Sequence, residues 1–180
     1  MKFTISFILL VALVSCHKES TPRALADEVM FSYLKQVRKE KNLAFFGFGA
    51  TAASDVREFR MNYRLSKLNY NKLESRELIV SLAENFIAKV NLDEKIRPYL
   101  HEFPVTYKKL SLSITFATFH LERPSEQYVA YVLLQKGKIY FCNYNHDTEM
   151  LCDLGEEFYE DALELCGFNS CENVVMGTEL

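Results

Sequence analysis

The cysteines of this chain are spaced so that they could form disulfides or bind a metal. Four of the five lie close together near the C-terminus: Cys142, Cys152, Cys166 and Cys171. Their spacing, C-x9-C-x13-C-x4-C, lacks the tight pairs that zinc sites use. If the chain is exported, an even, clustered set predicts two disulfides. We favour Cys142 with Cys152 and Cys166 with Cys171, because each pair closes a loop through a predicted turn or helix end. The alternative is four reduced cysteines that pack as small hydrophobic residues.

The fifth cysteine ends an apolar segment at the start of the chain. A basic Lys2 is followed by a largely apolar run over residues 3–14, too short to span a bilayer, which needs about 20 such residues. The run closes on four residues that resemble the lipobox of bacterial lipoproteins: Leu13, Val14, Ser15 and Cys16. The resemblance implies that residues 1–15 are a signal peptide and that the Cys16 thiol becomes acylated. The alternative is an ordinary secretory signal with a cysteine at a chance position.

The lipobox resemblance also implies a location. Acyl chains contribute about 0.8 kcal/mol per buried methylene, so a triacylated cysteine would anchor the protein permanently in a membrane. His17 stands where an inner-membrane retention signal would have Asp, which favours the outer membrane. Residues 16–21 would form a tether no longer than about 18 Å, and residues 22–180 are predicted to form one domain.

Two short motifs match catalytic or cofactor-binding patterns in letters only. Gly47-x-Gly49-x-x-Ala52 matches the dinucleotide-binding fingerprint, but a strand-like alternation follows it, where the fingerprint needs a helix. We predict a turn of small residues there and no cofactor. Ser32-x-x-Lys35 has the serine and lysine of penicillin-recognising enzymes without their other motifs, so we interpret it as a chance pair on a helix.

Metal binding and hydrolysis have little support in the sequence. The four histidines, His17, His101, His120 and His146, show no metal-ligand spacing, and HExxH and GxSxG are missing. Residues 143–149 alternate oxygen-bearing side chains as a calcium loop does, but Leu154 stands where the loop needs a bidentate Glu. We therefore predict a polar loop, no metal site and no enzyme.

Charge is distributed unevenly along the chain. Residues 139–180 hold ten acidic residues and no Lys or Arg, while residues 17–138 hold 20 basic and 14 acidic residues. One interpretation is that the two regions neutralise each other across one folded surface. The other is that the acidic segment recruits a cationic partner while basic residues face anionic headgroups. The acidic candidates for partner contacts are Glu156, Glu157, Glu160 and Asp161.

Hydrophobic periodicity predicts seven elements. Leu25, Val29, Tyr33 and Val37 recur at helical spacing, whereas residues 59–65 and 110–116 alternate as half-wet strands do. The expected elements are a helix at 22–41, a strand at 59–65, a helix from about 73 that ends before Pro98, strands at 110–116, 128–134 and 138–144, and a helix at about 156–166 capped by Gly167. Lys136-Gly137 should form a two-residue hairpin turn.

This order, αβαβββα, predicts an α+β fold: an antiparallel sheet of about four strands packed on one face by helices. It is similar to a cystatin-type arrangement of helix on sheet, a likeness of architecture alone. The polar faces of the strands at 59–65 and 110–116 should be exposed, which places Arg60 and Arg64 on the surface.

The leading hypothesis from the sequence is a non-enzymatic lipoprotein of the cell envelope that binds or assembles a partner, with no nucleic acid. Recognition would use Arg60 and Arg64 or the acidic segment. A second hypothesis is an apolar-ligand carrier or hydrolase with a cavity between sheet and helices, walled by these aromatic residues: Tyr63, Phe86, Phe116 and Tyr131. A third is an inhibitor or immunity protein whose acidic helix blocks a cationic cell-wall enzyme.

Overall fold

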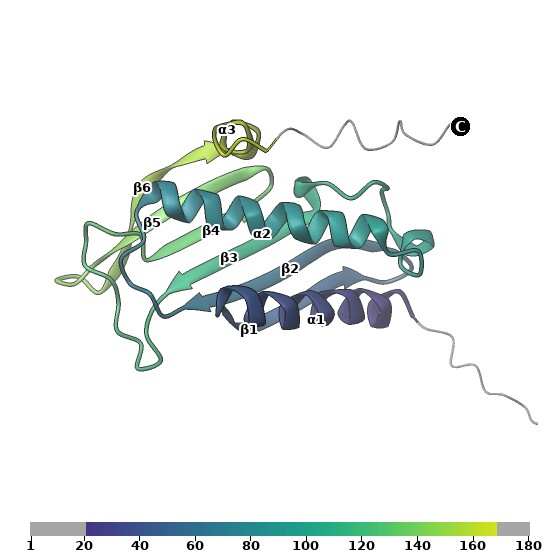
Figure 1. Cartoon of the computed structure of the whole chain (residues 1–180), viewed down its shortest axis with the longest axis horizontal. Coiled ribbons are helices and arrows are strands. Elements are labelled where there is room, and N and C mark those ends of the chain that lie inside the picture. The colour runs from purple at the N-terminus through teal and green to yellow at the C-terminus, as the bar shows by residue number, and fades with distance from the viewer. Residues whose placement is uncertain (1–20, 169–180) are drawn as a thin grey trace, which may run out of the picture.

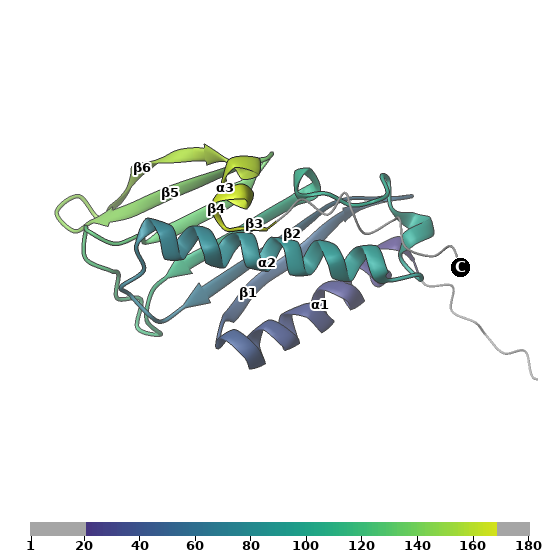
Figure 2. The same ribbon diagram turned by 45° about the horizontal axis from the view of Figure 1, so that its top comes forward.

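The structure is a computed structural model that describes residues 21–168. Within that range, helices lie on one side of a six-stranded sheet (Figures 1 and 2). The elements in chain order are α1 (Pro22–Lys41), β1 (Ala44–Ala52), β2 (Val56–Leu65), α2 (Lys72–Leu92), the 3-10 turns η1 (Arg97–Tyr99) and η2 (Tyr107–Lys109), β3 (Leu110–Phe116), β4 (Tyr131–Gln135), β5 (Lys138–Asn145), β6 (Met150–Phe158) and α3 (Tyr159–Leu165).

The strands lie in the sheet in chain order, β1-β2-β3-β4-β5-β6. Every neighbouring pair is antiparallel except β2 and β3, which are parallel and joined through α2. A parallel pair requires such a crossover, because a hairpin can join only antiparallel strands. The predicted α+β class is confirmed, but the prediction of about four antiparallel strands was wrong: the sheet has six strands and is mixed.

The two strands that the sequence did not predict are the edge strands β1 and β6. β1 contains the small-residue segment that we expected to be a turn, and it has a bulge between Phe45 and Gly47. A Cβ on Gly47 would lie 3.0 Å from Nδ2 of Asn62 on β2, so glycine here permits close packing of the strands. β6 loses its alternation at a bulge opposite Phe141 and Cys142. It continues to Phe158, so the last helix begins at Tyr159 and not at Glu156.

Local capping explains why the predicted helices begin and end where they do. The hydroxyl oxygen of Thr21 accepts a hydrogen bond from the Ala24 amide at 3.2 Å at the start of α1. α2 begins with a capping box, in which Asn71 and Glu74 each accept a hydrogen bond from the other's backbone amide at 2.9 Å. Gly167, at φ +72°, ends α3 as predicted.

The β4–β5 hairpin is also confirmed. Gln135 pairs with Lys138, and Lys136 and Gly137 have φ of 50° and 78°. Two successive positive φ angles define a type I′ turn, whose twist suits a two-residue hairpin.

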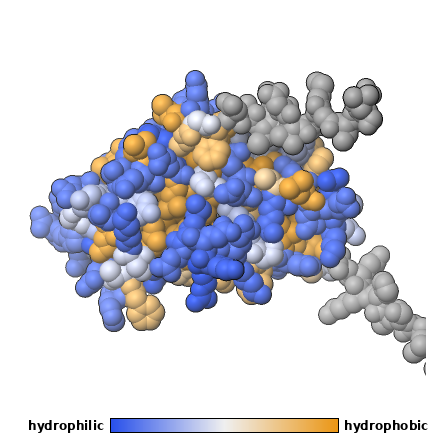
Figure 3. All heavy atoms as spheres, in the orientation of Figure 1, coloured by the Kyte–Doolittle hydropathy of each residue, from blue (hydrophilic) through white to orange (hydrophobic). Residues whose placement is uncertain are grey.

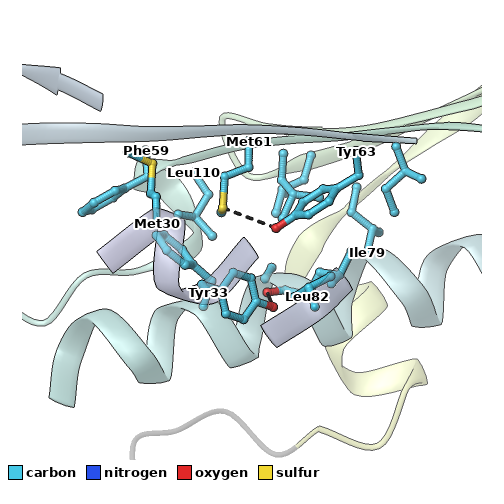
Figure 4. Close-up of a cluster of buried hydrophobic side chains, with 14 of the residues drawn as sticks. Met30, Tyr33, Phe59, Met61, Tyr63, Ile79, Leu82 and Leu110 are labelled. Atoms are coloured by element: carbon cyan, nitrogen blue, oxygen red, sulfur yellow. Dashed lines mark hydrogen bonds between the residues drawn. The ribbon is translucent and has the colours of Figure 1, made fainter. Parts of the chain in front are cut away.

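The core lies between the sheet and the helices. α1 packs on β1 and β2, α2 packs on β3 and β4, and α3 contacts α2 and β6. The Phe86 ring of α2 lies 5.3 Å from the Tyr33 ring of α1 and 5.2 Å from the Phe59 ring of β2. Figure 4 shows this layer, where the Tyr33 hydroxyl donates to the Leu82 carbonyl at 2.7 Å. Burial raises the pKa of Tyr33, so its hydroxyl stays a donor over the ordinary pH range.

Replacing Phe86 with Ala should destabilise the protein by about 3–5 kcal/mol, because it leaves a cavity where α1, α2 and β2 meet. Denaturant unfolding of the purified protein measures the change. Phe119→Ala is the matched control: that side chain is 84% exposed, so the free energy of unfolding should change by less than about 0.5 kcal/mol. Equal losses in both variants would contradict the core described above.

Candidate partner-binding surface

The sheet has one face that no helix or strand of residues 21–168 covers; we call it the uncovered face. On β2, Phe59, Met61 and Tyr63 are buried beneath the helices, so Arg60 and Arg64 point to the opposite side. Figure 3 shows the other side of the molecule, which carries the helices and on which hydrophilic residues predominate. Both arginines predicted as partner contacts therefore lie on the uncovered face.

Strand register arranges the uncovered face in three rows across the sheet. The first row runs Arg60, Ser111, Gln135, Lys138 and Phe158. The second runs Asn62, Ser113, Leu133, Tyr140 and Glu156. The third runs Arg64, Thr115, Tyr131 and Cys142. Cross-strand neighbours contact each other directly, so the face is a continuous surface of mixed polar and aromatic side chains.

The middle of this surface is less wet than expected. Ser111 and Ser113 are only 6% and 3% exposed, although they belong to the uncovered face. Longer side chains on β2 and β4 flank them, and the Ser113 hydroxyl donates to Oδ1 of Asn62 at 2.8 Å. The sequence predicted that one face of β3 is buried and the other is exposed to water. This was wrong for Ser111 and Ser113, because a short side chain between longer side chains on the neighbouring strands is shielded even without a covering layer.

The two arginines differ in how they are held. Arg60 is 58% exposed and lies 3.6 Å from a carboxylate oxygen of Glu58. The Arg64 guanidinium lies 5.2 Å from the centre of the exposed Phe46 ring, and its Nε is buried without a hydrogen-bond partner among the described residues. Stacking on an aromatic ring orients a guanidinium while its other donors remain available. Arg64 is thus the better positioned of the two to bind an acceptor.

Most of the acidic residues predicted as partner contacts are engaged within the protein. Glu157 accepts two hydrogen bonds from Arg76 of α2, at 2.6 and 2.8 Å, with both side chains only about 15% exposed. This contact raises the pKa of Arg76. Lys138 binds Glu156, and the Tyr107 hydroxyl donates to Glu160. Only Asp161 of the four has no hydrogen bond or ion pair recorded with another described residue.

The cysteines of the described range, Cys142, Cys152 and Cys166, are free thiols, and Cys171 lies outside that range, as do Cys16 and the rest of the lipobox. Cys142 pairs with Asp153 and Cys152 with Asn143, so neither cysteine lies directly opposite the other. Burial, with Asp153 and Cys152 nearby, raises the pKa of the Cys142 thiol, and burial also raises that of Cys166. The predicted disulfides stay a prediction.

Two other side chains considered for chemistry, those of His101 and Asn145, have structural partners. His101 lies 2.5 Å from Asp55, whose pKa is lowered by hydrogen bonds from Arg57 and His101. Asn145, in the loop that resembles a calcium site, accepts hydrogen bonds from the backbone and hydroxyl of Thr148 at 2.8 and 2.9 Å. Over residues 21–168, no three His, Cys, Asp or Glu side chains are grouped so that they could hold a metal ion.

The aromatic residues proposed as cavity walls do not all lie on one side of the sheet. Tyr63, Phe86 and Phe116 are buried in the core, at 1% exposure or less. Tyr131 faces the other way, on the uncovered face, where it pairs with Thr115 and Cys142.

A basic cleft at one end of the sheet was missed by the sequence reasoning. It has a volume of about 290 Å³ and is lined by four cationic side chains and one carboxylate among these residues: Thr51, Arg57, Glu58, Lys108, Lys109, Leu110, Gln135 and Lys136. The available signal was the Lys108-Lys109 pair directly before a strand. It could not be connected to Arg57 without knowing that β2 and β3 run parallel, or to Lys136 without knowing that β3 and β4 pair antiparallel.

Comparisons with known proteins identify no relative of this chain: no protein-family model, no curated protein and no solved structure matches it. In the part of the chain that the structure describes, none of the helices has the length and apolarity that crossing a bilayer requires.

The described cysteines should differ in the rate at which their thiols are alkylated. Cys152 is exposed and should be alkylated first, whereas the partly buried Cys142 and Cys166 should react severalfold more slowly because burial raises their thiol pKa. Alkylation at mildly alkaline pH followed by peptide mass mapping measures the order. If Cys142 and Cys152 resist alkylation until a reductant is added, the disulfide prediction holds and the register of β5 and β6 must differ from the one described.

Proposed function

We propose that this protein is a non-enzymatic lipoprotein of the cell envelope that binds a macromolecular partner through the uncovered face of its sheet. Acylated Cys16 would hold it in a membrane, with the outer membrane favoured. The observation that carries the proposal is the uncovered face itself, whose rows combine arginine and tyrosine side chains with no covering element from the described chain.

Exposure of a sheet face is not sufficient support, because antiparallel sheets commonly leave one face in water. The composition of this face is more informative. Tyr131, Leu133 and Tyr140 are neighbours on β4 and β5 and are partly exposed. Arg60 and Arg64 lie on β2, which is two strands away from β4. Tyrosine and arginine are enriched in protein–protein interfaces, since each combines apolar contact area with hydrogen-bond donors.

The acidic segment supports partner binding less well. Its carboxylates at Glu156, Glu157 and Glu160 would have to leave Lys138, Arg76 and Tyr107 before they could bind another protein. Breaking a shielded, bidentate pair such as Arg76–Glu157 leaves a charge without its partner, which is costly. On the uncovered face, no ion pair with a described residue is recorded for Arg64, Tyr131 or Tyr140, so no such pair has to be broken there.

Changing Cys16 to Ser should abolish acylation, because serine lacks the thiol that receives the lipid. Cells grown with labelled palmitate should incorporate label into the unaltered protein and into a Cys152→Ser control, and none into Cys16→Ser. Mass spectrometry of the N-terminal peptide measures the same change independently. Label retained after Cys16→Ser would show that the anchor is elsewhere.

A photo-crosslinking residue placed on each side of the molecule locates the partner. Leu133, on the uncovered face, and Leu73, 53% exposed on α2, form a matched pair of positions. We expect irradiation of intact cells to give a defined adduct from position 133 and none from position 73. A third probe at Asp161 tests the acidic segment, and an adduct from position 161 alone would overturn the assignment to the uncovered face.

A further inference from the structure

We infer that the basic cleft binds the anionic phosphate headgroups of the membrane that holds the lipid anchor. This inference rests on the proposed function, because it takes the membrane surface as the occupant. It adds an orientation of the domain on the membrane. The end of the sheet with the cleft faces the lipid, and the uncovered face lies to the side of that end.

The cleft is built by chain segments that meet at a single end of the sheet. β2 and β3 both begin there, β1 and β4 both end there, and the β4–β5 turn carries Lys136. The 3-10 turn η2 supplies Lys108 and Lys109 directly before β3. Four cations from three separate segments are therefore gathered around one carboxylate, that of Glu58.

Two of these cations, Lys108 and Lys136, make no direct ion pair with a described residue. Lys109 binds Glu102 at 2.8 Å, and Arg57 binds Asp55 at 3.0 Å. No ion pair is recorded for Lys108 or Lys136 with any residue from 21 to 168. The Lys108 ammonium lies 5.7 Å from the centre of the Tyr107 ring, and its charge helps to lower the pKa of Glu102, whose direct ion-pair partner is Lys109. Glu58, for its part, lies 3.6 Å from Arg60. The two unpaired ammonium groups provide the positive charge that an anion would meet.

The start of α1 lies at this same end. The Arg23 guanidinium, in the first turn of α1, donates to the Ala50 carbonyl at 3.0 Å, and Thr51, the next residue, lines the cleft. Figure 1 shows α1 beginning at the end of the sheet where β2 and β3 begin. From Thr21 to Cys16 the chain can extend no more than about 18 Å. An acylated Cys16 would thus keep the cleft within reach of the headgroups.

Charge complementarity selects the occupant. Phosphodiester headgroups carry the negative charge of a lipid surface, and basic side chains close to such a surface are attracted within about a Debye length. A lysine binds phosphate as a point charge without a fixed geometry, which suits binding of lipid headgroups better than selective binding of one small molecule.

Lysine acetylation of the acylated, full-length protein tests the inference. The protein is inserted by its acyl chains into vesicles of phosphatidylcholine alone or of an equal mixture with phosphatidylglycerol, and the labelling rate of each lysine is measured by mass spectrometry. We expect Lys108 and Lys136 to be labelled about fivefold more slowly on the mixed vesicles. High salt should remove this protection. Lys39, exposed near the far end of α1, is the matched control and should be labelled equally on both.

A variant adds a second readout. Lys136→Gln should bring the labelling rate of Lys108 on mixed vesicles toward its value on phosphatidylcholine, whereas Lys39→Gln should not.

Equal rates for Lys108 and Lys136 on the two vesicle types overturn the inference. Protection on phosphatidylcholine vesicles by inorganic phosphate alone also overturns it, because the cleft would then be a site for a soluble anion. The mass of the Cys16 peptide, read from the same sample, reports separately whether the anchor of the proposed function exists.

Discussion

Burial of α2 against the middle of the sheet is the packing constraint on which the rest of the structure depends. α2 follows β2 and returns the chain so that β3 lies parallel beside it, and its buried side chains include Ile79, Leu82, Phe86 and Val90. The Phe86 ring also contacts Tyr33 of α1, so one residue joins both helices to the sheet. Because every helix packs on this side, the opposite face has no partner within residues 21–168. The uncovered face is thus a consequence of where the core lies.

The charged residues acquire roles that their count along the chain does not indicate. The acidic segment holds β6 and α3 to the rest of the domain, through Glu157 to Arg76 of α2 and through Glu160 to Tyr107 before β3. These contacts join residues that are far apart in the sequence, so they hold β6 and α3 against elements that come earlier in the chain. Lys108 and Lys136, the two cleft cations that make no direct ion pair with a described residue, lie at the opposite end of the sheet from the β5–β6 turn. The charge without a direct ion pair at that end is therefore positive.

Sequence periodicity was most informative for elements with one buried face. α1, α2, β2 and β3 were predicted because apolar residues recur where each element contacts the core. β1 and β6 were not predicted, because an edge strand with a bulge lacks regular alternation and is paired on one side only. The sheet therefore has two more strands than the sequence predicted. Arg60 and Arg64 were correctly placed on a face away from the core, while the cleft, assembled from distant segments, was not foreseen.

The sequence by itself determined the class of fold, the extent of α1, the start of α2, the end of α3 and the β4–β5 turn. These depend on periodicity, capping side chains and glycines with positive φ, all of which act over a few residues. The sequence also carries the lipobox resemblance at Cys16. Only the tertiary structure decided that β2 and β3 are parallel, that Ser111 and Ser113 are shielded, that Glu157 belongs to Arg76, and that Lys136 lies near Lys108. Each of these depends on contacts between residues far apart in the chain, which local physical chemistry cannot specify.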